Sequence, residues 1–494
     1  PSYQLPSRNA DYQRAVNVYP EIIESGTGKE GQAAYFKSSE GLKLLFELGQ
    51  GPIRLIHFDG LENDDGSYFQ ANRVFVVSGS KVFRLTWNGV DGWDTLELGD
   101  LDTSEGPVSA ASLSIDYGVT VFVDGSDENY VYHKTTTTTE TFETFTSAGY
   151  SPVARATQVI WLDGYLVFIV KDTNQFYVNE WNSLTVPASN FASAEGSPDN
   201  ILAVISNNRD LWLLNERSVE IFANTGNADF PFERMQGGFI ENGCLSAFSV
   251  AKIDGIVFWL GRNSNGQGVV YAAQGANHQR ISTHAIERKI ATFQNVENAR
   301  AYTYQIGGHS FYLINFEETT FVYDLSTKMW HERMFTNDGE LERHRGETLV
   351  FFPDFGHHIV GDYENAKLYY LDSETYADDD APLTRMRVFP HVSNGLKNIF
   401  VERLQLDMET GVGLDGAITN QGYDPQVMMR FSDDGGHTWS NEMWVSAGKI
   451  GEYKKRCIWR RLGRSRDRIF EIKMTDPVKC TWLSCEIDLK GGVS

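Results

Sequence analysis

Apolar and polar positions repeat in a fixed order along the middle of the chain. Each copy has an apolar run, a short turn, a strongly apolar run, a polar turn and a further apolar run. The three clearest copies are residues 158–181, 248–273 and 301–330. Asp163-Gly164 and Asp254-Gly255 are two-residue hairpin signals at the first turn, and Gly307-Gly308 occupies the matching place. Each copy therefore predicts three or four short antiparallel strands.

The spacing of the copies predicts the architecture. The first apolar residues of the seven central strands are Val74, Val121, Leu166, Leu211, Ile256, Phe311 and Ile359. Successive anchors are 47, 45, 45, 45, 55 and 48 residues apart, a period typical of β-propeller blades. Central strands such as residues 165–170 are apolar on both faces, as expected for sheets packed between neighbours. We predict an all-β protein with a propeller of seven blades, or six if a terminal copy belongs elsewhere. Two β-sandwiches with coincidental spacing are the alternative.

The pattern changes on both sides of the repeat. Residues 1–50 alternate extended stretches with Gly-rich turns, which is typical of an arm or a partial sheet. Residues 374–385 are acidic and rich in turn formers, and the strict alternation over residues 401–408 predicts a strand with one wet face. We therefore predict an N-terminal arm over 1–50, a propeller over 51–384, and a β-sandwich-like domain over 385–494 that packs with the arm.

Charge narrows the range of partners. The formal net charge is −23, and such a surface repels DNA phosphates, so a nucleic-acid-binding protein is not expected. The same charge suits a passage through which DNA slides without sticking. The chain has no run of 18 apolar residues and no apolar signal core at its start. We expect no membrane span and no export by the usual route.

The stretch FSDDGGHTWS contains an Asp box, a pattern common in sialidases and other secreted glycosidases. Its key residues are Ser432, Asp434, Gly436 and Trp439. We interpret it as a structural turn, in which Asp434 bonds to backbone amides, Gly436 takes a positive φ and Trp439 packs beneath the hairpin. Sialidase-type catalysis needs an arginine cluster, a tyrosine nucleophile and an acid, and the box supplies none of them. We predict no enzyme, no catalytic residue, no metal and no cofactor; a propeller-fold carbohydrate-active enzyme is the alternative.

A basic run interrupts the acidic chain near its end. Its cations are Lys449, Lys454, Lys455, Arg456, Arg460, Arg461, Arg464, Arg466 and Arg468. Three interpretations are open: a solvated face, a surface that docks on an acidic partner such as another copy of the chain, or a phosphate contact. Our candidate subunit or adaptor interface comprises the cations from Lys454 to Arg468, of which three are expected to pair with acidic neighbours: Arg464, Arg466 and Arg468. Asp467 and Asp476 are expected to organise the turn before Pro477.

The same run carries a family resemblance. WRRLGRSRDRIFEIKMTDPVK (459–479) resembles the C-terminal signature of the packaged-DNA stabilisation proteins of short-tailed bacteriophages, also named tail hub or nozzle proteins. NVYPEIIESGTGKEG (17–31) is similar to the opening of that family, and LQLDMETGVG (404–413) and residues 361–394 are also similar to family text. The signature positions are Arg464, Asp467, Arg468, Asp476 and Pro477.

The resemblance implies a structural virion protein. Six copies would form a ring below the portal and its adaptor, close the DNA channel and keep the genome in the capsid until ejection. Tail fibres, spikes or a needle would attach to the ring, and DNA would pass without specific binding. The protein would be assembled in the cytoplasm of the host bacterium and act in the virion tail. A carbohydrate-active virion enzyme, sialidase-like or a depolymerase, is the competing function.

Overall fold

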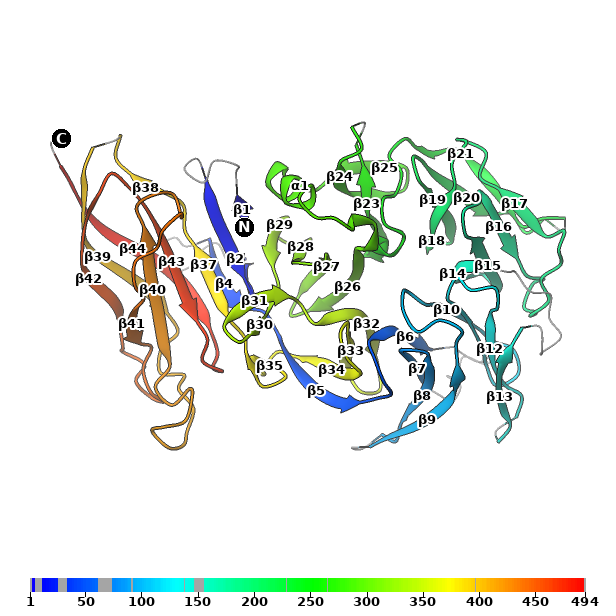
Figure 1. Cartoon of the computed structure of the whole chain (residues 1–494), viewed down its shortest axis with the longest axis horizontal. Coiled ribbons are helices and arrows are strands. Elements are labelled where there is room, and N and C mark those ends of the chain that lie inside the picture. Colours follow the sequence, from blue (N-terminus) through cyan, green and yellow to red (C-terminus); the bar gives the residue numbers. More distant parts are fainter. Residues whose placement is uncertain are drawn as a thin grey trace.

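The computed structural model describes residues 2–4, 11–24, 33–60, 73–89, 92–136, 138–145, 155–227, 229–263, 265–395 and 397–492. These residues are almost entirely strands and turns. The helical exceptions among them are α1 (His284–Ile290) and the 3₁₀ turns Ala247–Ser249 and Val296–Asn298. Figure 1 shows a circle of small sheets on one side and a stack of long strands on the other. The prediction of an all-β fold is confirmed.

Seven antiparallel blades of four strands each form a β-propeller (Figure 1). Five blades are separate sheets, whereas the sixth and seventh are parts of larger sheets. The first blade has β6 (Ile53–Asp59), β7 (Arg73–Ser78), β8 (Lys81–Trp87) and β9 (Trp93–Asp100). The second has β10 (Ser109–Leu113), β11 (Val119–Val123), β12 (Tyr130–Lys134) and β13 (Glu140–Thr144). The third has β14 (Ala156–Leu162), β15 (Tyr165–Val170), β16 (Gln175–Val178) and β17 (Phe191–Ser193). The fourth has β18 (Ile201–Asn207), β19 (Asp210–Asn215), β20 (Val219–Asn224) and β21 (Phe232–Ile240).

The last three blades complete the circle. The fifth has β22 (Ala251–Ile253), β23 (Ile256–Arg262), β24 (Gly268–Gln274) and β25 (Asn277–Arg280). The sixth has β26 (Arg300–Ile306), β27 (His309–Asn315), β28 (Thr320–Asp324) and β29 (Met329–Glu332). The seventh has β32 (Gly346–Phe352), β33 (His357–Asp362), β34 (Lys367–Asp372) and, from the N-terminal region, β5 (Gly41–Glu47). All seven predicted anchors lie in the second strand of a blade, so the seven-blade prediction is confirmed.

Local sequence explains both the hairpins and the packing of the blades. Residues of the pairs Asp163-Gly164, Asp254-Gly255 and Gly307-Gly308 all have positive φ, the backbone that a two-residue type I′ hairpin requires. The central strands are buried on both faces because a neighbouring blade covers each side; every residue of β11 is buried. Val121 of the second blade and Phe168 of the third lie in one apolar cluster, which shows that the core runs between the sheets.

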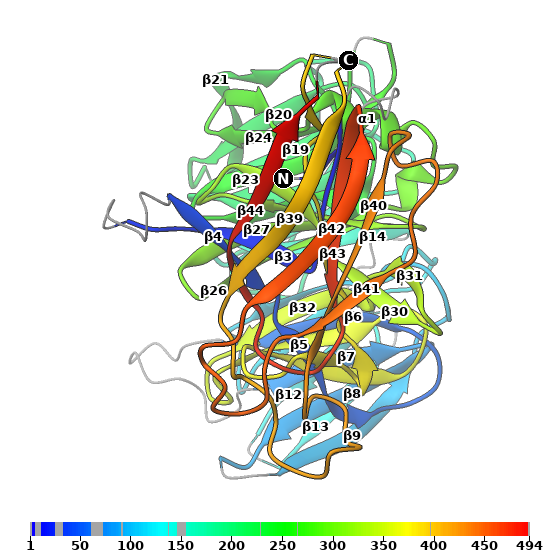
Figure 2. The same ribbon diagram turned by 90° about the vertical axis from the view of Figure 1, so that its left-hand side faces the viewer.

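The C-terminal region forms a β-sandwich. One layer has the order β3 (Val18–Ile22), β4 (Ala34–Ser38), β44 (Thr481–Gly491), β39 (Ile399–Met408) and β42 (Cys457–Ser465). The other has β2 (Tyr12–Val16), β37 (Arg385–Val388), β43 (Asp467–Met474), β40 (Gln426–Ser432) and β41 (Met443–Ser446), with β1 (Tyr3–Gln4) and β38 (Val392–Ser393) at its margins. Figure 2 shows β44, β39 and β42 in front of the second layer. Leu404, Trp459 and Ile472 contribute to the core between the layers.

The N-terminal residues join the two domains. Strand β2 pairs with β37 of the sandwich and, in parallel, with β29 of the sixth blade, so one sheet runs from propeller to sandwich. Its Arg14 binds Glu332 of β29, with Nε 3.2 Å from Oε1. The Asn17 amide donates to the carbonyls of Met334 and Thr384, both at 2.9 Å. Other short strands at this junction are β30 (Met334–Asn337), β31 (Glu340–Arg343), β35 (Ala377–Asp378) and β36 (Ala381–Pro382). These bonds fix the sandwich against the propeller.

Candidate interaction surface

The Asp box forms a closed turn after β40. The Asp434 carboxylate accepts hydrogen bonds from the backbone amides of His437 (2.9 Å) and Thr438 (2.8 Å) and from the Thr438 hydroxyl (2.6 Å). These bonds hold the pKa of Asp434 below its ordinary value, with the Thr438 hydroxyl as the largest cause. The Gly436 amide donates to the Ser432 hydroxyl at 2.8 Å, and Gly436 has a φ of 85°. The carboxylate is thus held as an ionised hydrogen-bond acceptor, which does not suit it to donate a proton.

The tryptophan of the box connects this turn to its surroundings. The Trp439 ring lies 4.8 Å from the Arg430 guanidinium carbon and 6.5 Å from the Tyr12 ring on β2. Arg430 in turn binds Glu471 of β43 in a two-bond ion pair, at 2.6 and 3.0 Å. The contacts of the box therefore run into the packing of the sandwich.

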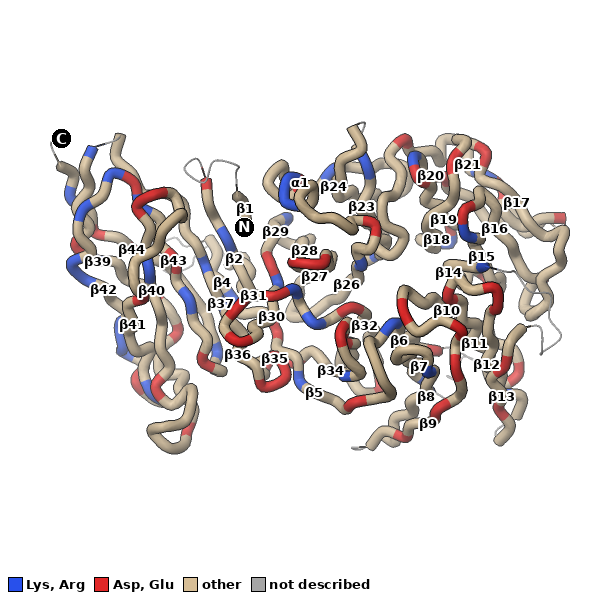
Figure 3. Tube along the Cα trace, in the orientation of Figure 1, with Lys and Arg blue, Asp and Glu red and all other residues tan. Residues whose placement is uncertain are grey.

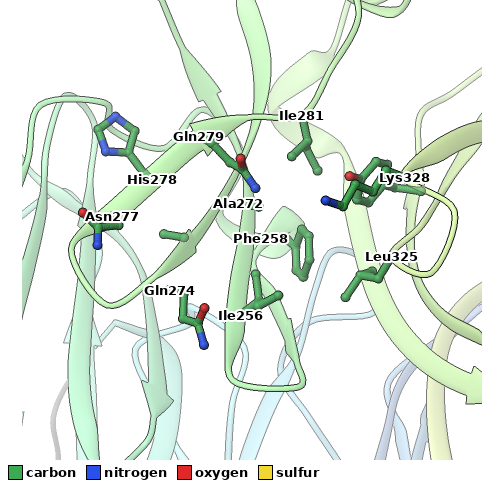
Figure 4. Close-up of a pocket in the computed structure, with 12 residues that line it drawn as sticks. Ile256, Phe258, Ala272, Gln274, Asn277, His278, Gln279, Ile281, Leu325 and Lys328 are labelled. Atoms are coloured by element: carbon green, nitrogen blue, oxygen red, sulfur yellow. The ribbon is translucent and has the colours of Figure 1, made fainter.

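One cavity bears on the alternative that the protein is a carbohydrate-active enzyme. It has a volume of about 370 Å³ and lies between the fifth and sixth blades (Figure 4). Phe258, Ile281 and Leu325 supply apolar walls, and Asn277 and His278 are polar residues at its border. None of the described residues that line it is an aspartate or glutamate. Glycoside hydrolysis ordinarily uses two carboxyl groups, so this cavity lacks the usual acid chemistry.

The side chains of the adjacent residues His357 and His358 do not come together in one metal site. The His357 ring packs 4.9 Å from Tyr370, whereas the His358 ring packs 4.9 Å from Phe351, in keeping with the alternation of side chains along β33. A search of the described ranges finds no group of three or more His, Cys, Asp or Glu placed to hold a metal ion. In the same ranges no helix is long and apolar enough to span a bilayer.

The predicted interface cations divide into two groups. Seven are exposed on the loop before β42, on β42 itself and on the turn after it: Lys454, Lys455, Arg456, Arg460, Arg461, Arg464 and Arg466. Arg468 is 2% exposed and binds both Asp433 oxygens, at 2.6 and 2.7 Å, while its guanidinium carbon lies 3.9 Å from the Phe431 ring. The expected pairing of Arg468 with a neighbouring subunit is therefore corrected: its guanidinium is engaged inside the sandwich and is inaccessible to a partner.

The two signature aspartates serve different turns. The Asp476 carboxylate accepts a hydrogen bond from the backbone amide of Gln426 at 2.7 Å. This bond ties the start of β40 to the turn containing Pro477. Asp467 lies at the other end of β43, in the tight turn from β42, and its carboxylate is 2.7 Å from His391 Nδ1. Both aspartates were expected to organise the turn before Pro477. Asp476 lies at that turn, as expected. Asp467 lies at the opposite end of β43, so the expectation is wrong for this residue.

Family comparisons match both domains. The family model described as bacteriophage P22 Gp10, beta-propeller, matches residues 6–376. The model described as bacteriophage P22 Gp10, beta-sandwich, matches residues 384–490. The chain belongs to the bacteriophage P22 Gp10 family. This is a tail and packaged-DNA stabilisation family of podoviruses, and the chain is accordingly a structural protein of the phage virion.

Other comparisons describe fold alone. No curated protein matches the chain. Among solved structures, the WD40 β-propeller domain of Doa1 is 10% identical with a TM-score of 0.40, covering 67% of this chain and 97% of that one. The extracellular domain of the putative one-component system BT4673 from B. thetaiotaomicron is 10% identical with a TM-score of 0.42, covering 88% and 57%. These scores carry no functional inference.

A buried polar junction between the N-terminal region and the sixth blade was missed by sequence reasoning. His309 of β27 lies 2.9 Å from Asp324 and 3.0 Å from Glu21 of β3. Burial, the largest single cause, lowers the pKa of His309, but the two carboxylates together outweigh it and raise the pKa above its ordinary value. Nearby, buried Arg333 donates to the Glu40 backbone carbonyl, at 2.5 Å. The partners are 288 and 293 residues apart, so no local pattern in the sequence points to them.

Proposed function

We propose that this protein is the subunit of a tail hub, or nozzle, in a podovirus. Six copies form a ring below the portal and its adaptor, close the DNA channel, retain the packaged genome and anchor fibres, spikes or a needle until ejection. The observation that carries the proposal is that one chain matches both P22 Gp10 domains, the propeller and the sandwich. The finer role follows from the resemblance of residues 459–479 to tail hub proteins.

The charge distribution supports this role on physical grounds. Residues 1–384 hold 26 Lys and Arg against 52 Asp and Glu, a formal net charge of −26. An acidic wall repels DNA phosphates, so a genome that passes it forms few ion pairs that would slow ejection. The loops that join the blades offer many separate attachment points on a rigid body, which suits the anchoring of tail appendages.

Genome retention tests the proposal directly. Particles packaged without this protein should release their DNA, so the fraction of the genome accessible to a nuclease should rise severalfold. Addition of the purified chain to freshly packaged particles should restore protection, and a heat-denatured sample of the same chain serves as the control. Equal protection with and without the chain would contradict a role in genome retention.

The competing enzyme function has its own test. Incubation of the purified chain with fluorogenic sialosides and with polysaccharide from the host is expected to give no turnover. Turnover that survives repurification would favour a carbohydrate-active virion enzyme.

A further inference from the structure

The seven exposed cations lie within thirteen residues of the chain, on β42 and the segments that flank it, and are here named the basic edge: Lys454, Lys455, Arg456, Arg460, Arg461, Arg464 and Arg466. Strand β42, which carries the central three, is the last strand of its sheet and pairs with β39 on one side only. Among the described residues, only Lys455 has a carboxylate within 4.0 Å, at 3.9 Å from Glu452. The other six cations have no ion-pair partner within that part of the chain.

The strand register places like charges opposite each other on the outer face of the sandwich. Arg460 lies directly opposite Arg403 of β39, a cross-strand arrangement that is unfavourable for two cations. Arg403 is satisfied by Asp488 of β44, at 2.8 Å, whereas Arg460 is not. Arg464 lies opposite Phe400, whose side chain is itself exposed. The isolated chain therefore leaves this edge electrostatically unsatisfied.

The two domains have opposite charge. Residues 385–494 hold 17 Lys and Arg against 14 Asp and Glu, a formal net charge of +3, while the rest of the chain carries −26. Figure 3 shows the arginines of β39 and β42 at the far side of the sandwich from the propeller, and acidic residues distributed over the blades. The surface that complements the basic edge is thus on the same protein, but at a distance that one copy does not bridge.

Exposed apolar side chains accompany the basic edge. Tyr453 is 74% exposed immediately before Lys454, and Ile450 is 58% exposed in the same loop. Trp444 is 60% exposed on β41, the strand of the other layer that contacts β42. Large exposed aromatic residues are frequent anchors of protein interfaces, and charges around them set orientation and association rate. The combination fits a protein partner with an acidic surface.

We propose that the basic edge of one copy docks on the acidic propeller of the next copy, head to tail. This inference rests on the proposed hub function and names the contact that builds its ring. A two-fold contact centred on the basic edge would bring two such edges together and is disfavoured by their charge. A heterologous contact joins different surfaces and generates a closed ring when the rotation between copies closes.

Charged residues on an edge strand also have a simpler use, because they prevent edge-to-edge aggregation. The two explanations predict different results for charge reversal. Glutamates protect an edge as arginines do, but they cannot dock on an acidic surface. Arg460→Glu/Arg464→Glu therefore separates docking from protection, since both side chains are exposed and neither has an ion-pair partner in the described part of the chain.

Zero-length cross-linking identifies the contact itself. A 1:1 mixture of unlabelled and ¹⁵N-labelled chain is treated with a carbodiimide, which joins a lysine amine to a carboxylate, and the peptides are identified by mass spectrometry. Docking predicts mixed-isotope links from Lys454 or Lys455 to Asp or Glu of the propeller, residues 41–372, and not to the N-terminal strands β2 to β4 of the sandwich. Links from these lysines only within one copy, or only between two sandwiches, would overturn it.

Mass photometry of the charge-reversal variant completes the test. Arg460→Glu/Arg464→Glu should weaken self-association, alone or on portal–adaptor complexes, by at least about tenfold. Lys171→Glu/Arg262→Glu is the matched control, because it changes the net charge equally at two exposed propeller sites. Wild-type rings that the Arg460→Glu/Arg464→Glu variant forms equally well would overturn the docking inference and leave the hub function intact. A wild-type chain that self-associates neither alone nor on portal–adaptor complexes would contradict both the docking inference and the hub function.

Discussion

The propeller and the sandwich use their cations in different ways. In the propeller, buried arginines are bonded within the chain: Arg73 binds Asp59 at 2.5 Å with both side chains almost fully buried. In the sandwich, Arg468 is bonded in this manner, but the neighbouring Arg464 and Arg460 are exposed and unpaired among the described residues. The difference teaches that one basic run contains both a buried structural arginine and exposed cations, which a count of charges does not separate.

The domains also differ in how they are completed. Six blades are built from consecutive strands, so their pairing is local. The seventh blade and both layers of the sandwich require strands from the N-terminal region, for example Gly41 of β5 opposite Asp372 of β34. The sandwich and the closure of the propeller therefore depend on the same N-terminal segment, and damage to it should affect both domains.

The largest stability effect is expected at Arg468. Arg468→Ala leaves Asp433 and the backbone carbonyl of Leu462 without their partner, so we expect a loss of about 3 kcal/mol in the stability of the sandwich. Hydrogen exchange of β40–β43 should accelerate while exchange of the central propeller strands stays unchanged. Arg464→Ala is the control and should alter stability by no more than about 0.5 kcal/mol. Equal effects of the two substitutions would remove the distinction between the buried structural arginine and its exposed neighbour.

Acid should destabilise the propeller more than the sandwich. The effect of each histidine should be somewhat smaller than that of Arg468→Ala. Burial lowers the pKa of His331 from 6.5 to about 3 and those of His57 and His358 to about 4. A histidine with a lowered pKa stabilises the fold above pH 6.5, and this contribution is lost as the pH falls toward the folded-state value. At pH 4.5 the expected cost for His331 is about 2–3 kcal/mol.

Thermal melting from pH 7.5 to 4.5 measures this difference. His331→Phe removes the titrating group and should flatten the acid slope. His437→Asn, at an exposed site of the sandwich, should leave the slope as it is in the wild-type chain. A His331→Phe protein with an unchanged slope would show that this histidine does not govern acid sensitivity.

The smallest effect is expected at the Asp box. Asp434→Ala removes the acceptor of the His437 and Thr438 amides, so the melting temperature of the sandwich should fall modestly. Asp415→Ala, on an exposed loop of the same domain, is the control. Self-association measured by mass photometry should be the same for both variants. Loss of ring formation with Asp434→Ala alone would give the box a role beyond its turn.

The fold could be predicted where the signals are local. The positive-φ pairs at Asp163-Gly164 and Asp254-Gly255, and the apolar central strands, identify the blades because hairpin geometry and burial are set within a few residues. The place of β5 in the seventh blade could not be predicted, since its partner strand β34 follows more than 300 residues later. Propensity contains no information about such distant pairing.

The candidate surface was predicted in outline. The basic run was visible in the sequence, and seven of its eight candidate interface cations are exposed. Arg468 was misassigned because the tight turn between β42 and β43 directs it inward to Asp433, and a turn interrupts the alternation that would otherwise predict exposure. The opposite charge of the two domains could have been found from the sequence once residue 385 was chosen as the boundary.

Electron cryomicroscopy of the chain assembled on its portal–adaptor complex tests the central claim most directly. The account predicts a closed ring in which β42 of each sandwich, with Arg460 and Arg464, contacts acidic residues on the propeller of the next copy. A ring in which sandwiches contact sandwiches, or in which β42 faces solvent, would contradict it.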